Sequence, residues 1–533
     1  MGSRNRLETG AVYDIAGWLL VATAFIYTVF RAYYLPINHD EAVTFLTQIW
    51  KPKSVWQIIT YSIPTVNNHI LNTLFMKLLY SWFGASEFGF RISALFGHLL
   101  YLIGIYLILR LFMKGPRFLI GLLLCVSHPF LLNHFSIAKG YPLALGWFTL
   151  GLYFSFRVAM ENDFKKNKEV AYIVLSCAML SIAVLAHLTF LNVFLSMIVL
   201  FIILEFETWW NEFRRGSFLL PLWKVVLNKI ILPILPWCIF LALIYTGPII
   251  KLRKYHEFYV GGDQGFWADT VASMIQVSIY RKLDWAGVLI FGGVAFIAIV
   301  YAFGAFLILE KLFKRKPFEL IDRLLSWLVL LMLFCSLSIV FQHILFAVKY
   351  GIDRTAIYFI PMFLLYLCVL WEKIQGMRPY LRRILNPLFS ALALISIGYF
   401  ISCANVKEHY GKNGADIDRL MNDVLSLRKA GILAKTPVEI GSDWPDSPMI
   451  NFYIIKNKMD WTRPLPRYQN FDQIQKRFDC YYLRKRDELF IKTHRLKIIK
   501  HYELSDSYLA IPVEYAKLYE EKLMAVKKNG RSE

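Results

Sequence analysis

Apolar residues occur along this chain in blocks of about 20, the length that an α-helix needs to cross the hydrocarbon core of a bilayer. Charged residues make up only 18% of the sequence, whereas about 25% is usual in soluble domains. The sequence therefore predicts a mainly α-helical, polytopic membrane protein with about eleven spans. These spans are expected at about 15–35, 91–110, 118–134, 141–157, 170–186, 188–205, 230–248, 286–309, 325–346, 355–371 and 387–404.

The formal net charge of +21 does not indicate a nucleic-acid partner, because most Lys and Arg residues occur in short tracts between the apolar blocks. Such tracts orient spans, since cytoplasmic loops carry the excess of positive charge. If the N-terminus is cytoplasmic, about 20 basic residues fall in the cytoplasmic loops and about 11 in the opposite loops. This orientation and eleven spans predict an extracytoplasmic C-terminus.

The long polar segments all fall on the predicted outer side, at about 36–90, 249–285 and 405–533. The first contains apolar residues at helical spacing, typical of amphipathic helices at a membrane surface. We therefore expect a transmembrane domain over 1–404 and a small extracytoplasmic α/β domain over 405–533. The expected elements of the α/β domain are a helix at about 414–430 and strands at about 438–440, 481–483, 496–499 and 508–513.

The most informative short motif is Asn38-His39-Asp40-Glu41, directly after the first apolar block. Adjacent carboxylates at a membrane surface are costly unless they are used. Asp40 could also cap the helix that begins near Ala42, because carboxylates are favoured at helix N-termini. The two interpretations are compatible, since a capped carboxylate is held in place.

Further motifs follow at predicted outer ends of spans: Asn67-Asn68-His69, Glu87-Phe88-Gly89-Phe90-Arg91, Ala138-Lys139-Gly140-Tyr141 and Tyr350-Gly351-Ile352-Asp353-Arg354-Thr355. In their order and sidedness they resemble the GT-C superfamily of membrane glycosyltransferases. The resemblance is to the branch that contains dolichyl-phosphate-mannose protein mannosyltransferases and bacterial aminoarabinose transferases, and it covers about residues 10–405.

The resemblance implies that Asp40 is the catalytic carboxylate, with Glu41 beside it to orient the acceptor or support Asp40. It also implies an extracytoplasmic site in a cell membrane, here expected to be a bacterial inner membrane. The chain departs from the family pattern where His69-Ile70-Leu71 replaces a common His-Pro-Pro, and where Lys139 replaces a common Arg.

A phosphate-linked donor requires cations near its leaving group. Arg354 is the strongest candidate, because a guanidinium binds phosphate oxygens in a bidentate manner. Lys139 and the neighbouring Tyr141 are further candidates. Arg253 and Lys254 are candidates as well, but they lie in a long loop, where side chains are more often simply solvated. For Arg354 and Lys139, the alternative is a simple interfacial anchor.

Histidines His39, His69, His134, His187 and His343 lie at or near the outer side. No pair has the helical spacing of zinc ligands, so we expect His39 and His69, with Asn68, to line an acceptor site or polar pocket. No metal site is predicted and no cofactor is required. A divalent cation remains an alternative, with Asp40, Glu41, His69 or an acid of 249–285 as ligands.

Together these features predict an inverting glycosyltransferase that moves a hexose or pentose from a polyprenyl-phosphate to an acceptor on the extracytoplasmic side. The expected partners are the lipid-linked donor, membrane lipids and an acceptor that is a protein, a lipid or a glycan. The alternatives are a lipid-linked glycan polymerase or ligase and a transporter or flippase. A transporter should carry charges near the bilayer midplane, whereas the ionisable residues here collect at the outer ends.

Overall fold

The computed structural model describes residues 2–50, 54–160, 168–214, 222–280, 286–408, 414–466 and 477–529. The chain forms two compact units with interleaved boundaries. Unit 1 contains Met1–Val29, Ser54–Leu74 and Ile92–Ala404, and unit 2 contains Phe30–Lys53, Phe75–Arg91 and Asn405–Glu533. Two segments near the N-terminus therefore group with the C-terminal domain.

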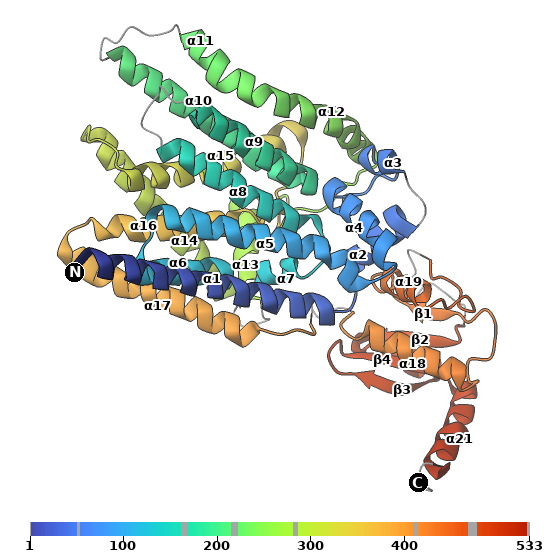
Figure 1. The fold of residues 1–533 in the computed structure, drawn as a ribbon. Helices are drawn as coiled ribbons and strands as arrows, with labels where there is room; N and C mark the ends of the chain where they lie inside the picture. The colour runs from blue at the N-terminus through green and yellow to red at the C-terminus, as the bar shows by residue number, and fades with distance from the viewer. Residues whose placement is uncertain are drawn as a thin grey trace. The chain divides into compact units, whose positions relative to one another are not determined.

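Unit 1 is helical, and Figure 1 shows its long helices side by side. Its α-helices are α1 (Gly2–Tyr34), α3 (Val55–Ile59), α5 (Glu87–Phe112), α6 (Gly115–Val126), α7 (Pro129–Phe135), α8 (Gly140–Met160), α9 (Lys168–Ala186), α10 (Leu191–Arg214), α11 (Leu222–Val226), α12 (Leu232–Lys254), α13 (Ala272–Ile279), α14 (Ala286–Phe313), α15 (Leu320–Phe346), α16 (Phe359–Gln375) and α17 (Pro379–Cys403). Short 3₁₀ or π segments are η2 (Leu188–Phe190), η3 (Leu227–Ile231), η4 (Phe266–Val271) and η5 (Asp353–Ala356).

The predicted fold class is confirmed, with a difference in the number of spans. Within the described residues, nine helices are long and apolar enough to cross a membrane, or ten if the bent pair α6 and α7 is one span. This pair corresponds to the predicted span at 118–134 and bends by 62°. Pro129 at the start of α7 explains the break, because proline lacks the N–H that would continue the helix. The predicted span at 355–371 is α16, whose 17 residues reach about 25 Å, short of a 30 Å core.

Unit 2 combines the first predicted outer loop with the α/β domain. The loop forms α2 (His39–Thr44), the π segment η1 (Phe45–Trp50) and most of α4 (Ile70–Phe83). The α/β domain contains α18 (Ile417–Lys429), β1 (Ile440–Ser442), α19 (Ser447–Lys456), β2 (Cys480–Arg484), η7 (Lys485–Asp487), α20 (Glu488–Thr493), β3 (Leu496–Tyr502), β4 (Ser507–Pro512) and α21 (Val513–Asn529).

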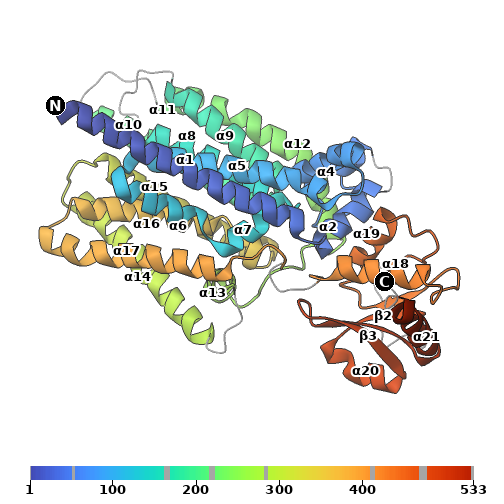
Figure 2. The same ribbon diagram turned by 60° about the horizontal axis from the view of Figure 1, so that its bottom comes forward.

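The four strands form one mixed sheet in the order β1-β2-β4-β3. Strands β1 and β2 are parallel, with Gly441 opposite Tyr481, and the other pairs are antiparallel. Figure 2 shows this sheet together with α18, α20 and α21. The parallel pair brings the carboxyl ends of β1 and β2 to the same edge, which places the segments after Ser442 and Arg484 near each other.

Candidate active site

The predicted catalytic carboxylate Asp40 lies in the first turn of α2, in unit 2, and is half-buried. A capping box fixes this turn, because the Asn38 side chain accepts a hydrogen bond from the Glu41 backbone N–H (2.9 Å) and the Glu41 carboxylate accepts one from the Asn38 N–H (3.0 Å). The sequence NHDE is therefore a well-capped helix start, and Asn38 rather than Asp40 is the N-cap.

Glu41 is buried and faces Arg91 at the start of α5. The guanidinium donates from Nε and Nη2 to the two carboxylate oxygens, at 2.9 and 2.8 Å. Arg91 also donates to the carbonyls of Ala32 (3.0 Å) and Pro36 (2.7 Å). Because both oxygens of Glu41 are bound, this carboxylate holds α2 in place.

Helix α2 also packs against α19 of the α/β domain, within unit 2. The Pro445 carbonyl accepts a hydrogen bond from His39 Nδ1 at 2.7 Å, so Nδ1 carries the proton. The Ile37 N–H donates to the hydroxyl of Tyr453 at 3.4 Å. The rings of Phe45 and Phe452 meet edge-to-face at 5.2 Å. His39, predicted to line a pocket, thus joins the first turn of α2 to the α/β domain.

A second group of predicted residues meets in unit 1, around the start of α8. The rings of Tyr141 and His187 stack with centroids 4.0 Å apart, and His187 lies 4.4 Å from the ring of His69. Gly140 permits this approach, since a Cβ at that position would lie 2.8 Å from the His69 ring. Lys139, the residue before it, is only 8% exposed.

Basic residues surround His187. Burial lowers the pKa of His187 well below its usual value, and neighbouring cationic or protonatable groups lower it further: His69, Arg354, Lys139 and His134. The groups that act most strongly on His187 are thus all basic. His187 Nδ1 accepts a hydrogen bond from the Thr189 N–H at 3.3 Å, so the neutral ring carries its proton on Nε2 and is a donor there.

Arg354 lies in η5, the short turn that leads into α16, and is half-buried. Asp353 beside it adopts a left-handed backbone (φ 46°), and its N–H donates to Ser273 Oγ at 3.0 Å. Burial raises the pKa of the Asp353 carboxyl, while Arg354 opposes that rise. A basic cluster formed by Lys139, His187, His69 and Arg354 is suited to bind an anion with several oxygens.

The other residues predicted for the site, Arg253, Lys254 and Asn68, have different surroundings. Arg253 and Lys254 are exposed in the last turn of α12, and the Lys254 ammonium lies 6.0 Å from the ring of Tyr255. Asn68 is fully buried, and its side chain donates to the Ile58 carbonyl at 2.8 Å. Asn68 therefore shapes its own loop, and we no longer assign it to a pocket lining.

Arg91, His134 and His187 take part in these contacts, although the sequence alone gave them no role. Arg91 stood in the motif Glu87-Phe88-Gly89-Phe90-Arg91, but its partner Glu41 is 50 positions away. No local spacing indicated that His187 would meet His69. Across the described ranges, no group of three or more His, Cys, Asp or Glu side chains is arranged to hold a metal ion.

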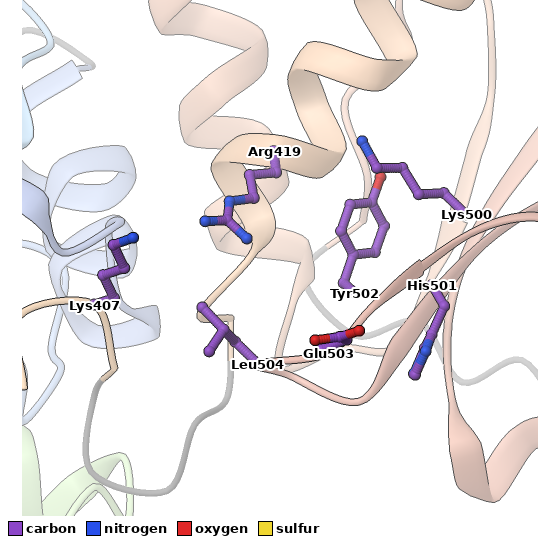
Figure 3. A pocket seen from close by; sticks show the side chains of 7 residues that line it. All are labelled: Lys407, Arg419, Lys500, His501, Tyr502, Glu503 and Leu504. Carbon is purple, nitrogen blue, oxygen red and sulfur yellow. The ribbon is translucent and has the colours of Figure 1, made fainter.

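A pocket of about 520 Å³ lies in unit 2 (Figure 3), and its labelled side chains are Lys407, Arg419, Lys500, His501, Tyr502, Glu503 and Leu504. Two of its three cations have carboxylate partners, since Arg419 binds Asp416 at 3.0 Å and Lys500 binds Asp423 at 2.8 Å, and Glu503 adds a further carboxylate to the lining. The pocket is therefore close to neutral, unlike the cluster of unit 1, and we do not assign the donor phosphate to it.

The fold is that of a polytopic α-helical membrane protein with a small α/β domain. Among solved structures, the chain is similar to ArnT from Cupriavidus metallidurans bound to undecaprenyl phosphate, with 11% identity and a TM-score of 0.49 over 94% of this chain and 98% of that chain. It is also similar to the same protein in the apo state, with 12% identity and a TM-score of 0.43 over 93% and 98%.

No protein-family model and no curated protein sequence matches the chain.

Proposed function

We propose that this protein is an inverting glycosyltransferase that uses a polyprenyl-phosphate-linked sugar as donor and an extracytoplasmic hydroxyl as acceptor. The observation that carries the proposal is the basic cluster of Lys139, His187, His69 and Arg354, in which Lys139 and His187 are buried, in a unit that contains the candidate membrane-spanning helices. Several basic groups gathered in this way are suited to bind the phosphate of a lipid-linked donor.

In the proposed reaction, Asp40 accepts the proton of the acceptor hydroxyl as its oxygen attacks the anomeric carbon. The bond from that carbon to the phosphate oxygen breaks, and polyprenyl phosphate leaves with the electron pair, so the configuration is inverted. General-base catalysis of this kind contributes about 10²–10⁴ in rate. The basic cluster stabilises the charge that grows on the leaving phosphate, which makes a general acid unnecessary.

The direct test measures transfer by the purified, lipid-reconstituted protein from radiolabelled polyprenyl-phosphate sugars to an envelope glycolipid fraction. Transfer from the monophosphate donor, with polyprenyl phosphate as the second product, would support the proposal. Transfer from a diphosphate-linked glycan alone would support a polymerase or ligase. Movement of the lipid across the bilayer without cleavage would support a flippase, and either of these results would contradict the proposal.

Substitutions of Arg354 test the phosphate site by charge and geometry together. We expect Arg354→Ala to lower kcat/KM for the donor by about tenfold to a hundredfold, because charged hydrogen bonds contribute roughly 1.5–3 kcal/mol each. Arg354→Lys should lie in between, since lysine keeps the charge but loses the bidentate geometry. Arg253→Ala, which removes an exposed arginine of α12, is the matched control and should leave donor kinetics unchanged. Wild-type kinetics in both Arg354 variants would exclude this residue from the site.

The proposed orientation can be tested with two exposed lysines. Lys435 lies in the α/β domain and Lys314 follows α14, and each side chain is 56% exposed. In intact cells, an impermeant thiol reagent should label Lys435→Cys, whereas Lys314→Cys should react only after the membrane is permeabilised. Labelling in the reverse order would place the α/β domain in the cytoplasm and remove the argument for a lipid-linked donor.

A further inference from the structure

The segment after β1 lies at the carboxyl edge of the parallel pair β1 and β2, where open α/β sheets commonly bind ligands. Its sequence is Ser442-Asp443-Trp444-Pro445-Asp446-Ser447. The neighbouring segment after β2 is η7, Lys485–Asp487. Both segments belong to unit 2, as does helix α2 with Asp40.

The segment is held firmly at several points. Asp446 is 1% exposed and accepts two hydrogen bonds from Arg484, at 2.8 and 2.9 Å. The Pro445 carbonyl accepts the hydrogen bond from His39. Ser447 Oγ donates to the Asp443 carbonyl at 3.3 Å. Anchors on both sides of Trp444 therefore fix the backbone that carries its indole.

Despite these anchors, the Trp444 side chain is 45% exposed. Its ring meets the ring of His39 edge-on, with centroids 5.7 Å apart, and His39 is the residue before Asp40. Next to Trp444, the carboxylate of Asp443 forms an ion pair with the exposed guanidinium of Arg486. A partly exposed indole on an anchored backbone thus contacts His39, the residue before the proposed base Asp40, and its neighbour Asp443 carries a charged pair with Arg486.

We propose that Trp444, with Asp443 and Arg486, forms an acceptor subsite that binds a sugar ring. The negative face of an indole attracts the weakly positive C–H groups of a pyranose, and burying that face removes apolar surface from water. Carboxylate and guanidinium groups then accept from and donate to the hydroxyls around the ring. The inference rests on the proposed function and narrows its acceptor to a glycan or glycolipid, rather than a Ser or Thr side chain of a protein.

A membrane anchor is the other common role of an exposed tryptophan, because indoles favour the headgroup region. The local charge argues against it here. Asp443 and Asp446 on either side of Trp444 are paired with Arg486 and Arg484, so these pairs leave no excess of positive charge around the indole, whereas anionic headgroups attract basic segments. Charge-paired surroundings suit the hydroxyls of a neutral sugar better than a phosphate surface.

Steady-state kinetics with the envelope glycolipid fraction as acceptor provide the first test. We expect Trp444→Ala to raise the acceptor KM about tenfold, with donor KM and kcat at saturating acceptor unchanged. Trp444→Phe should retain most of the affinity, because it keeps an aromatic face. Trp82→Ala removes a tryptophan of the same unit that is 70% exposed, and this matched control should change nothing. An unchanged acceptor KM in Trp444→Ala would overturn the subsite while leaving the proposed function intact.

The second test does not depend on transfer. In protein labelled with 5-fluorotryptophan, the ¹⁹F resonance of Trp444 is the signal that Trp444→Phe lacks. Glycans released from the same glycolipid fraction by mild acid should shift this resonance saturably, and a lipid spin-labelled at its headgroup should not broaden it. Broadening by the lipid, or no shift with the glycans, would overturn the proposal. If the wild-type protein transfers no sugar but the resonance shifts, the proposed function fails and the sugar subsite stands.

Discussion

Asp40→Asn should abolish sugar transfer while leaving the fold and donor binding nearly intact. The substitution keeps the size and the half-buried position of the side chain. An amide, however, cannot take up the proton of the acceptor hydroxyl as a carboxylate does. We expect kcat to fall by about 10²–10⁴, the usual contribution of a general base. Transfer from a radiolabelled polyprenyl-phosphate sugar measures the loss, and native mass spectrometry with undecaprenyl phosphate measures the retained donor binding.

The control for this substitution is Asp460→Asn, which makes the same chemical change at an exposed position of unit 2. Its kinetics should equal those of the wild type. Asp40→Glu, which keeps the carboxylate but shifts it by one methylene, should recover part of the activity. Normal turnover by purified Asp40→Asn protein would contradict the proposed mechanism.

Loss of Arg91 is expected to be the most destabilising single change in unit 2. Arg91→Ala would leave the buried Glu41 carboxylate without its partner and remove the donors to the Ala32 and Pro36 carbonyls. Breaking a buried ion pair in this way costs about 3–5 kcal/mol, because the remaining charge is uncompensated. A fall in the thermal unfolding midpoint of the detergent-solubilised protein, together with loss of transfer, would be the observed result.

The double variant Arg91→Ala/Glu41→Gln separates the charge effect from the lost packing. It should be more stable than Arg91→Ala alone, because a neutral amide tolerates burial better than an unpaired carboxylate. Arg477→Ala is the matched control, since Arg477 pairs with Glu514 at 2.9 Å and both side chains are more than half exposed. An exposed pair contributes little, so the midpoint should barely move. Equal stability of Arg91→Ala and Arg477→Ala would contradict the role given to the buried pair.

The surroundings of Glu41 were predictable from the local motif only in part. The motif Asn38-His39-Asp40-Glu41 predicted a helix start, with Asp40 as a possible cap of a helix that begins near Ala42. The capping box is instead formed by Asn38 and Glu41, and the helix begins at His39. The ion pair of Glu41 was not predictable from the motif, because its partner Arg91 lies 50 positions away in the chain. Only the fold decides which of two adjacent acids meets a buried arginine.

The basic cluster of unit 1 likewise combines residues that a local motif indicated with one that only the fold brings to it. Lys139 and Arg354 were candidates because each precedes a predicted span on the outer side, which is a local property. His187 joined them only through the packing of α8, α9 and the segment around His69, where Gly140 leaves room for the ring. A lysine or histidine in isolation has no sequence signal that separates an interfacial anchor from an anion ligand. The four basic residues that lower the pKa of His187, namely His69, His134, Lys139 and Arg354, come from three separate parts of the chain.

The sequence by itself determined the membrane class and, in the α/β domain, one helix and four strands, whereas α19, α20 and α21 were not predicted. Blocks of about 20 apolar residues can satisfy their backbone hydrogen bonds in a bilayer only as helices, and the short apolar runs near residues 481, 496 and 508 have the length and composition of strands. The tertiary structure alone decided that segments 30–53 and 75–91 pack with 405–533, and that His39 meets Pro445. Periodicity reports which face of an element is apolar, whereas the choice of partner depends on side-chain shape and charge summed over residues far apart in the chain.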